Sequence, residues 1–94
     1  MRVLKKNPGE VWKVIEIENN LQVLQETVGG YIEAVTIAVD CCILVDEEGR
    51  LKGLPYNTTI CKYDLVGPVL LVGVDGEDFT DVSPDLELIL RGFG

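Results

Sequence analysis

Four side chains in the middle of the chain carry polar groups that could bind or transform a small molecule: Tyr31, Glu33, Tyr56 and Asn57. Glu33 interrupts a mostly apolar run, where a carboxylate either faces solvent or, if it is buried, needs partners. Tyr56 and Asn57 lie in the polar stretch Leu54–Thr59, where an asparagine either caps a turn or reads a polar ligand. If Tyr31, Glu33 and Asn57 shared one pocket, they could serve a small enzyme in acid–base chemistry.

The best-known catalytic sets cannot be built from this chain. It contains no histidine, which excludes Ser-His and Cys-His pairs and histidine-bound metals. Its cysteines are Cys41, Cys42 and Cys61, and three cysteines without a CxxC motif do not make a four-cysteine zinc site. Adjacent cysteines on a strand point to opposite faces, so Cys41 and Cys42 are not expected to form a disulfide with each other. All three cysteines are expected to be reduced, partly buried small hydrophobes. The sequence therefore predicts no catalytic residues, no metal and no cofactor.

Acidic residues form a second candidate surface. The chain has 16 acidic and 8 basic residues, and residues 64–94 hold seven of the acids and one base, Arg91. Four carboxylates surround Gly76 in a turn-rich segment: Asp75, Glu77, Asp78 and Asp81. Their order does not match a calcium loop, and direct binding to nucleic acid or anionic lipid is disfavoured. The acidity of residues 64–94, with these four carboxylates as its candidate acidic face, either keeps the protein soluble, docks on a basic partner, or imitates DNA to block a nucleic-acid-binding enzyme.

The first third of the chain predicts a β-hairpin and a short helix. Alternation in residues 2–18 predicts two strands around a turn, with Trp12 on the exposed face. In residues 19–29, Asn19 or Asn20 is a helix N-cap, and apolar residues spaced by three and four form the buried face. These apolar residues are Leu21, Leu24 and Val28. Gly29 is placed to end the helix in the left-handed conformation.

The remainder predicts further strands and a closing helix. The ranges Tyr31–Asp40 and Cys41–Asp46 are strands, and another short strand is expected near Leu51. The nearly apolar range Leu65–Asp75 is a central strand, with a bulge or edge entry at its Gly-Pro pair. Pro55–Asp64 is either a loop or one helical turn. The last helix has Ser83 as N-cap, Pro84 in its first turn, an apolar face and Gly92 at its end. That face comprises Leu86, Ile89 and Leu90.

These elements predict an α+β fold in a single domain, residues 1–94. The order is ββαββ(β)βα, with two short helices on one side of a small, mostly antiparallel sheet. No apolar run is long enough to span a membrane, and the N-terminus does not look like a signal peptide, so a cytoplasmic location is expected. A homodimer is a further expectation, because an exposed Trp12 and edge strands leave surface to cover.

Three segments carry a resemblance to a known family. "LQETVGGYIEAV", "VDEEGRLKGLPYNTT" and "VGPVLLVG" are together similar to the uncharacterised domain-of-unknown-function 3846 family of phage and mobile-element proteins. The family pattern carries over to Leu24, Gly29, Gly30, Tyr31, Glu33, Glu48, Gly49, Leu54, Asn57 and Gly67. This chain has Asp46 where the family often has asparagine, and Thr58 and Thr59 in place of an arginine-containing run. The resemblance implies a mobile-element setting, and it implies no reaction.

Taken together, the residues and the resemblance favour a small non-enzymatic accessory protein. It is expected to inhibit a host defence or regulatory system by binding a host or phage protein or by sequestering a small nucleotide-type signal. A DNA mimic acting through the acidic face, and a small enzyme using Glu33, Tyr31 and Asn57, stay as alternatives.

Overall fold

A computed structural model describes the backbone of residues 1–91 and the side chains of residues 1–88. Its helices and strands, in chain order, are β1 (Arg2–Lys6), β2 (Lys13–Glu16), α1 (Leu21–Val28), β3 (Ile32–Ala38), β4 (Cys41–Asp46), β5 (Tyr56–Ile60), β6 (Tyr63–Val66), β7 (Val69–Asp75), β8 (Asp78–Thr80) and α2 (Pro84–Arg91). The α+β class is confirmed.

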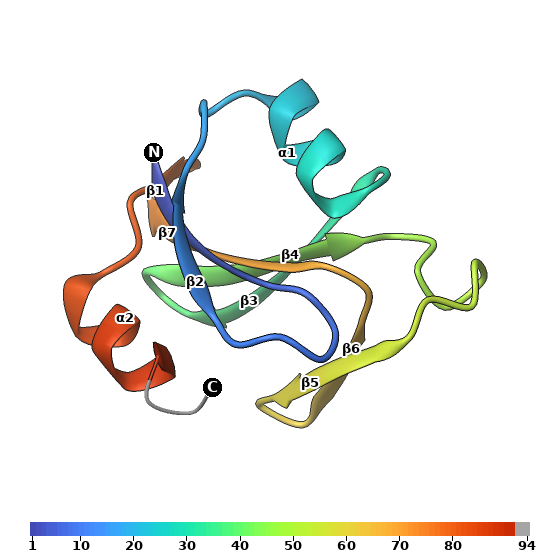
Figure 1. Ribbon diagram of the computed structural model, residues 1–94. Helices are drawn as coiled ribbons and strands as arrows, with labels where there is room; N and C mark the ends of the chain where they lie inside the picture. The colour runs from blue at the N-terminus through green and yellow to red at the C-terminus, as the bar shows by residue number, and fades with distance from the viewer. Residues whose placement is uncertain (92–94) are drawn as a thin grey trace.

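The main sheet is antiparallel, with strand order β2-β1-β7-β4-β3 and the short β8 added to β7 (Figure 1). The strand β7 lies at its centre, as predicted, and residues Val69–Gly73 are all buried. The predicted range was too long, however. Leu65 and Val66 belong to the separate strand β6, and the chain bends at Gly67, whose φ is +69°, before β7 begins.

Both faces of this sheet are covered. Alternate residues of β4 and β7 enter two cores, so Cys41 and Ile43 pack on one face while Cys42 and Leu44 pack on the other. The adjacent cysteines therefore do point to opposite faces. The first core, which we call the hairpin-side core, includes Leu65 of β6 and Leu86 of α2 as a partner. The second, the α1-side core, includes Leu24 and Val28 of α1.

Covering both faces overturns two predictions. The helices were expected on one side of the sheet, whereas α1 packs on one core and α2 on the other (Figure 1). Trp12 was expected to be exposed, but it is 5% exposed and part of the hairpin-side core. Ile15 and Ile17 do pack on one core, but Val11, which was predicted on the same face, is 55% exposed. The opposite face is buried as well, through Trp12 just before β2 and Val14 within it. The buried tryptophan also removes one reason for expecting a homodimer.

The helix α1 follows its predicted caps. The side chain of Asn20 accepts a hydrogen bond from the backbone of Val23 at 2.9 Å, which satisfies a free N–H of the first turn. Gly29 ends the helix with φ +91° and donates its N–H to Gln25. Leu24 and Val28 are buried as expected, but Leu21 is 63% exposed and does not belong to the buried face.

The segment predicted as a loop or helical turn is a β-hairpin, β5–β6, which forms its own two-stranded sheet. Its turn residues, Cys61 and Lys62, both have positive φ, at 49° and 70°. A tight hairpin turn of that kind is normally recognised from Asn-Gly or Asp-Gly, and Cys-Lys gives no such signal. The strand expected near Leu51 is likewise absent: this region is a turn and Leu51 is 87% exposed.

The helix α2 begins at Pro84, as predicted, and Leu86 packs against the hairpin-side core. It is tied to β1 by Arg2, whose guanidinium donates two hydrogen bonds to Glu87 at 2.8 and 3.0 Å. The predicted roles of Ile89, Leu90 and Gly92 lie outside the described side chains and residues. In the described part of the chain, neither helix has the length and apolar character that crossing a bilayer requires.

Candidate functional site

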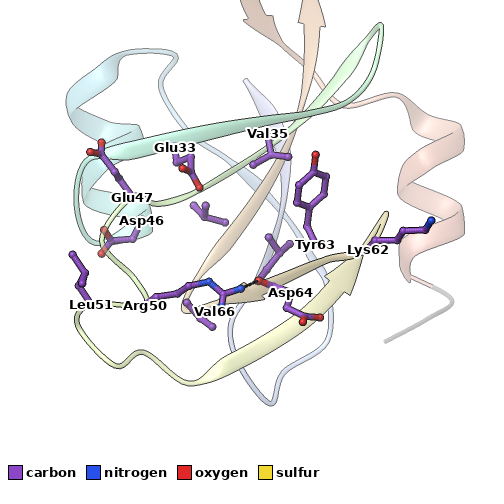
Figure 2. A pocket seen from close by; sticks show the side chains of 12 residues that line it. Glu33, Val35, Asp46, Glu47, Arg50, Leu51, Lys62, Tyr63, Asp64 and Val66 are labelled. Carbon is purple, nitrogen blue, oxygen red and sulfur yellow. Dashed lines mark hydrogen bonds between the residues drawn. The ribbon is translucent and has the colours of Figure 1, made fainter.

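A cleft of about 500 Å³ lies between the β3–β4 edge of the main sheet and the β5–β6 hairpin. Figure 2 shows it from close by, with β3 on one side and β6 on the other. It is lined by Glu33, Val35, Val45, Asp46, Glu47, Arg50, Leu51, Lys62, Tyr63, Asp64, Leu65 and Val66. Of these, Glu33 is the one that the sequence singled out.

The base of the cleft is apolar and belongs to the hairpin-side core. Val45 and Leu65 are buried in the hairpin-side core, and Val35 packs against it. These side chains reach the cleft because the alternation of β3, β4 and β6 turns one face of each strand inward. The base is therefore fixed by the same packing that holds the hairpin on the sheet.

Ionic and aromatic groups surround this base. The Arg50 guanidinium crosses the cleft and donates a hydrogen bond to the backbone oxygen of Asp64 at 2.6 Å, which caps the free edge of β6. The Glu33 carboxylate is directed into the cleft, and the Tyr63 ring stands opposite Val35 (Figure 2). Glu33 is exposed and Tyr63 is 49% exposed. The cleft thus offers groups of both charges and an aromatic ring to an incoming molecule.

One end of the cleft carries an ion pair between a buried carboxylate, Asp46, and an exposed ammonium, Lys52. The Asp46 side chain, only 2% exposed, accepts from the Lys52 ammonium at 2.7 Å and from the Glu48 backbone at 2.9 Å. The bond from Lys52, followed by that from Glu48, lowers the pKa of Asp46 although burial opposes this. A Cβ on Gly30 would lie 2.8 Å from an Asp46 oxygen. Gly30 therefore has a second role besides the sharp turn after Gly29: its lack of a side chain leaves room for the Asp46 carboxylate and the Lys52 ammonium.

Asn57 is buried and holds the hairpin in place. Its amide nitrogen donates to the backbone oxygens of Lys6 and Gly67, both at 2.7 Å, and its side-chain oxygen accepts from the Lys6 ammonium at 2.9 Å. Asn57 also sits in the bulge between Tyr56 and Thr58, and bulges commonly re-aim a side chain. These contacts join β1, β5 and the entry to β7, and they use both N–H donors of the amide and one acceptor position of its oxygen.

The residues singled out from the sequence do not share one pocket. Tyr31 is 67% exposed and lines a separate depression of about 420 Å³ beside α1, whereas Glu33 lines the main cleft. Tyr56 is exposed, and its hydroxyl lies 2.7 Å from that of Thr59. Asn57 is buried between the hairpin and β1. The hypothesis of a shared Tyr31, Glu33 and Asn57 site is wrong in its geometry.

The four candidates of the acidic face are all exposed. Asp75, Glu77 and Asp78 lie at the β7–β8 turn, where Asp75 and Asp78 pair across the strands. Asp81 accepts a hydrogen bond from the backbone of Arg2 at 2.7 Å. Asp64, in the same acidic third of the chain, lies on the hairpin instead. The carboxylates are therefore divided among different parts of the molecule.

Among the residues that the structure describes, no group of three or more metal-binding side chains is close enough to hold an ion. Cys41 and Cys42 are buried, and burial raises the pKa of the Cys41 thiol to about 11. Cys61 is exposed at the hairpin turn, which corrects the expectation that all three cysteines would be partly buried. Every buried side-chain nitrogen or oxygen in the described part has a hydrogen-bond partner.

The sequence missed Arg50 and Tyr63. Arg50 falls in a turn that was predicted to lead into a strand, and Tyr63 falls in the segment predicted to be a loop or helical turn. The alternation of Tyr63 and Leu65, opposite Ile60 and Thr58 in the hairpin register, is the signal that could have located the Tyr63 side of the cleft. This alternation could be recognised only once the turn at Cys61 and Lys62 was known to join two strands.

The fold and the site define a small α+β protein whose antiparallel sheet is covered on both faces and whose β3–β4 edge borders the open, charged cleft. The chain belongs to the family described as a domain of unknown function (DUF3846), whose model matches residues 1–94. No curated protein and no solved structure matches the chain.

Proposed function

We propose that this protein is a non-enzymatic binding protein that holds a partner protein against the cleft between the main sheet and the β5–β6 hairpin. The observation that carries the proposal is the composition of the cleft: an apolar base with Tyr63 beside it and exposed ionic groups around it. Protein interfaces commonly combine an apolar, aromatic centre with a polar rim. In the mobile-element setting that the family resemblance implies, the partner would be a host defence or regulatory protein.

The charges in the cleft favour a protein partner over a nucleotide-type signal. Besides Asp46, which is paired with Lys52, the lining includes three acids and two bases: Glu33, Glu47, Asp64, Arg50 and Lys62. Arg50 already donates one hydrogen bond to the Asp64 backbone oxygen, which reduces the number of its N–H groups that a phosphate could use. An excess of carboxylates repels a phosphate group, whereas it attracts the basic side chains of a protein.

A binding role is also better supported than catalysis. The residues expected to form an enzyme site are spread over different surfaces, and Asn57 is occupied by structural hydrogen bonds. Glu33 is exposed to solvent, whereas catalytic sites commonly exclude water from the reacting groups. The chain has no histidine to act in its place.

The DNA-mimic alternative receives less support from the arrangement of the carboxylates. Such a mimic needs acids along one continuous face, but Asp64 is on the hairpin while Asp75 and Asp78 are at the β7–β8 turn. Glu87 is largely buried and bound by Arg2. The exposed carboxylates that lie together are then those of the β7–β8 turn: Asp75, Glu77 and Asp78.

The proposal is tested by affinity capture from host lysate with the wild-type chain and three single variants. Tyr63→Ala and Glu33→Lys change the cleft, whereas Tyr56→Ala removes an exposed tyrosine of the same hairpin that does not line it. We expect one partner to bind the wild type and Tyr56→Ala equally, and the two cleft variants about tenfold more weakly or not at all. Absence of any partner, or a partner insensitive to both cleft variants, would contradict the proposal, and so would tight binding of a nucleotide alone.

A further inference from the structure

The strand β3 forms one outer edge of the main sheet, since its only partner in the described part of the chain is β4. At the opposite edge, β2 has four residues and two of them, Lys13 and Glu16, are charged. Short length and charge, especially lysine, are common protections against unwanted strand pairing. By contrast, β3 has seven residues, contains neither lysine nor proline, and carries one charge, Glu33.

The hydrogen-bond pattern shows which backbone groups this edge presents. Glu47 donates its backbone N–H to the Tyr31 oxygen at 2.8 Å, one step before the Ile32–Asp46 pair of the β3–β4 register. In antiparallel pairs, residues that exchange hydrogen bonds alternate with residues that do not. Tyr31, Glu33 and Val35 therefore point their backbone groups toward β4. The intervening residues, Ile32, Ala34 and Thr36, point theirs outward.

The regular part of this edge ends at the irregularity between Thr36 and Ala38. The outward-pointing groups before it form a continuous row that an extended chain could pair with. The side chains of Glu33 and Val35 project from the same strand into the cleft (Figure 2). A strand added to β3 would thus place alternate side chains beside Glu33 and Val35, at the border of the cleft.

We infer that the outer edge of β3 takes up a basic, extended segment of a partner protein as an added strand. This inference rests on the proposed function, and it specifies how the partner is bound. Added strands gain affinity from main-chain hydrogen bonds and specificity from alternate side chains. The charge of the occupant follows from Glu33 in the strand, from Glu47 beside its start, and from the chain's net charge of −8. A lysine or arginine opposite Glu33 forms a favourable cross-strand pair.

A second copy of the chain fits this edge less well. Two such chains would each bring a net charge of −8. If two β3 strands paired antiparallel about Ala34, the two Glu33 side chains would lie diagonally across the pair on the same face. Residues placed diagonally across a strand pair lie about 7–8 Å apart. This distance is shorter than the range over which salt screens charges at low ionic strength, so the two Glu33 carboxylates would repel each other.

The test uses the whole chain and two fluorescent peptides, one alternating lysine with valine and the other alternating glutamate with valine. We expect the lysine peptide to bind at low salt, to weaken as salt is added, and to protect the amides of Ile32, Ala34 and Thr36 from hydrogen exchange. Ala34→Pro removes an outward N–H while leaving the β4 hydrogen bonds in place. It should weaken binding about tenfold, the effect of one lost hydrogen bond and the associated misfit. Ala34→Val keeps the N–H and serves as the matched control.

Glu33→Lys provides the charge test, because it should weaken the lysine peptide and strengthen the glutamate peptide. The inference is overturned if the lysine peptide does not bind, if Ala34→Pro binds it as well as Ala34→Val does, or if the glutamate peptide binds the wild type equally. It is also overturned if the wild type is a dimer that Ala34→Pro makes monomeric, because a second copy would then occupy the edge. A captured partner that is lost with Tyr63→Ala but kept with Ala34→Pro would preserve the proposed function and reject the added strand.

Discussion

Replacing Asn57 with alanine should cause a large loss of stability without removing much apolar surface. Asn57 is 7% exposed, and its amide makes three hydrogen bonds with Lys6 and Gly67. Alanine would leave two backbone oxygens without this donor and would take an acceptor from the buried Lys6 ammonium. A buried polar group left unsatisfied costs about 1–3 kcal/mol. We therefore expect the free energy of unfolding to fall by about 3–5 kcal/mol in total.

That loss is a large fraction of the stability of a domain of this size, which is typically about 5–15 kcal/mol. Each kcal/mol lowers Tm by roughly 4–8 °C in a domain of this size, so a decrease of about 12–40 °C is expected. Urea and thermal unfolding followed by circular dichroism provide the measurement. Fluorescence of Trp12, the single tryptophan, reports on the core that the hairpin covers.

A matched control is available on the same hairpin. Thr59 is exposed, and its hydroxyl bonds to the Asp64 carboxylate at 2.7 Å, so Thr59→Ala should cost under about 1 kcal/mol because water replaces the lost partner. Asn57→Asp keeps an acceptor for Lys6 but loses both amide donors, and it should also be destabilised. If Asn57→Ala lowered the free energy of unfolding by less than about 1 kcal/mol, the assignment of this network as the hairpin's anchor would be refuted.

Three further predictions concern other parts of the structure. Because the pKa of Asp46 is lowered in the folded state, its contribution to stability is present above its unfolded value of about 3.9 and is lost as pH falls through the folded value. In urea titrations, Asp46→Asn should therefore flatten the decrease in unfolding free energy below about pH 4, and an unchanged slope would contradict this. Gly30→Ala should lower the free energy of unfolding by about 1–3 kcal/mol, because its Cβ displaces the Asp46–Lys52 pair. In chemical denaturation, this loss should be smaller in a Lys52→Ala background. Gly29→Ala should lower the free energy of unfolding by about 1 kcal/mol in either background, because only its left-handed backbone is affected. A thiol reagent should modify one cysteine, Cys61, in the native protein and all three after unfolding, and rapid native modification of a second thiol would show that the sheet opens.

The parts of the fold that could be predicted are those whose cause is local. The helix α1 was predicted from an asparagine N-cap at position 19 or 20, from three apolar residues at helical spacing and from Gly29, and each of these signals acts within one or two turns of the chain. Only Leu21 among the three apolar residues is exposed. The strand β7 was placed at the centre of the sheet because a strand buried on both faces must be apolar on both. Its surroundings confirm this reason.

The parts that could not be predicted depend on distant segments. Trp12 alternates with apolar neighbours as an exposed residue of a half-buried strand would, and only the packing of the hairpin-side core buries it. Asn57 looks like a residue that caps a turn, but its partners Lys6 and Gly67 are 51 and 10 residues away. Glu33 was singled out as the charged residue of an apolar strand, yet the cleft that it lines exists only because the hairpin is folded over the sheet.

This dependence determines how a binding experiment on the cleft should be interpreted. One wall of the cleft is β6, and the position of the hairpin relative to the sheet depends on Asn57 through its bonds to Lys6 and Gly67. A substitution at Asn57 would thus weaken a partner's binding by displacing the hairpin, although Asn57 does not line the cleft. Tyr63→Ala and Ala34→Pro act where a partner would touch and leave these bonds intact. Loss of binding in those two variants, with Tm close to that of the wild type, would separate recognition from folding.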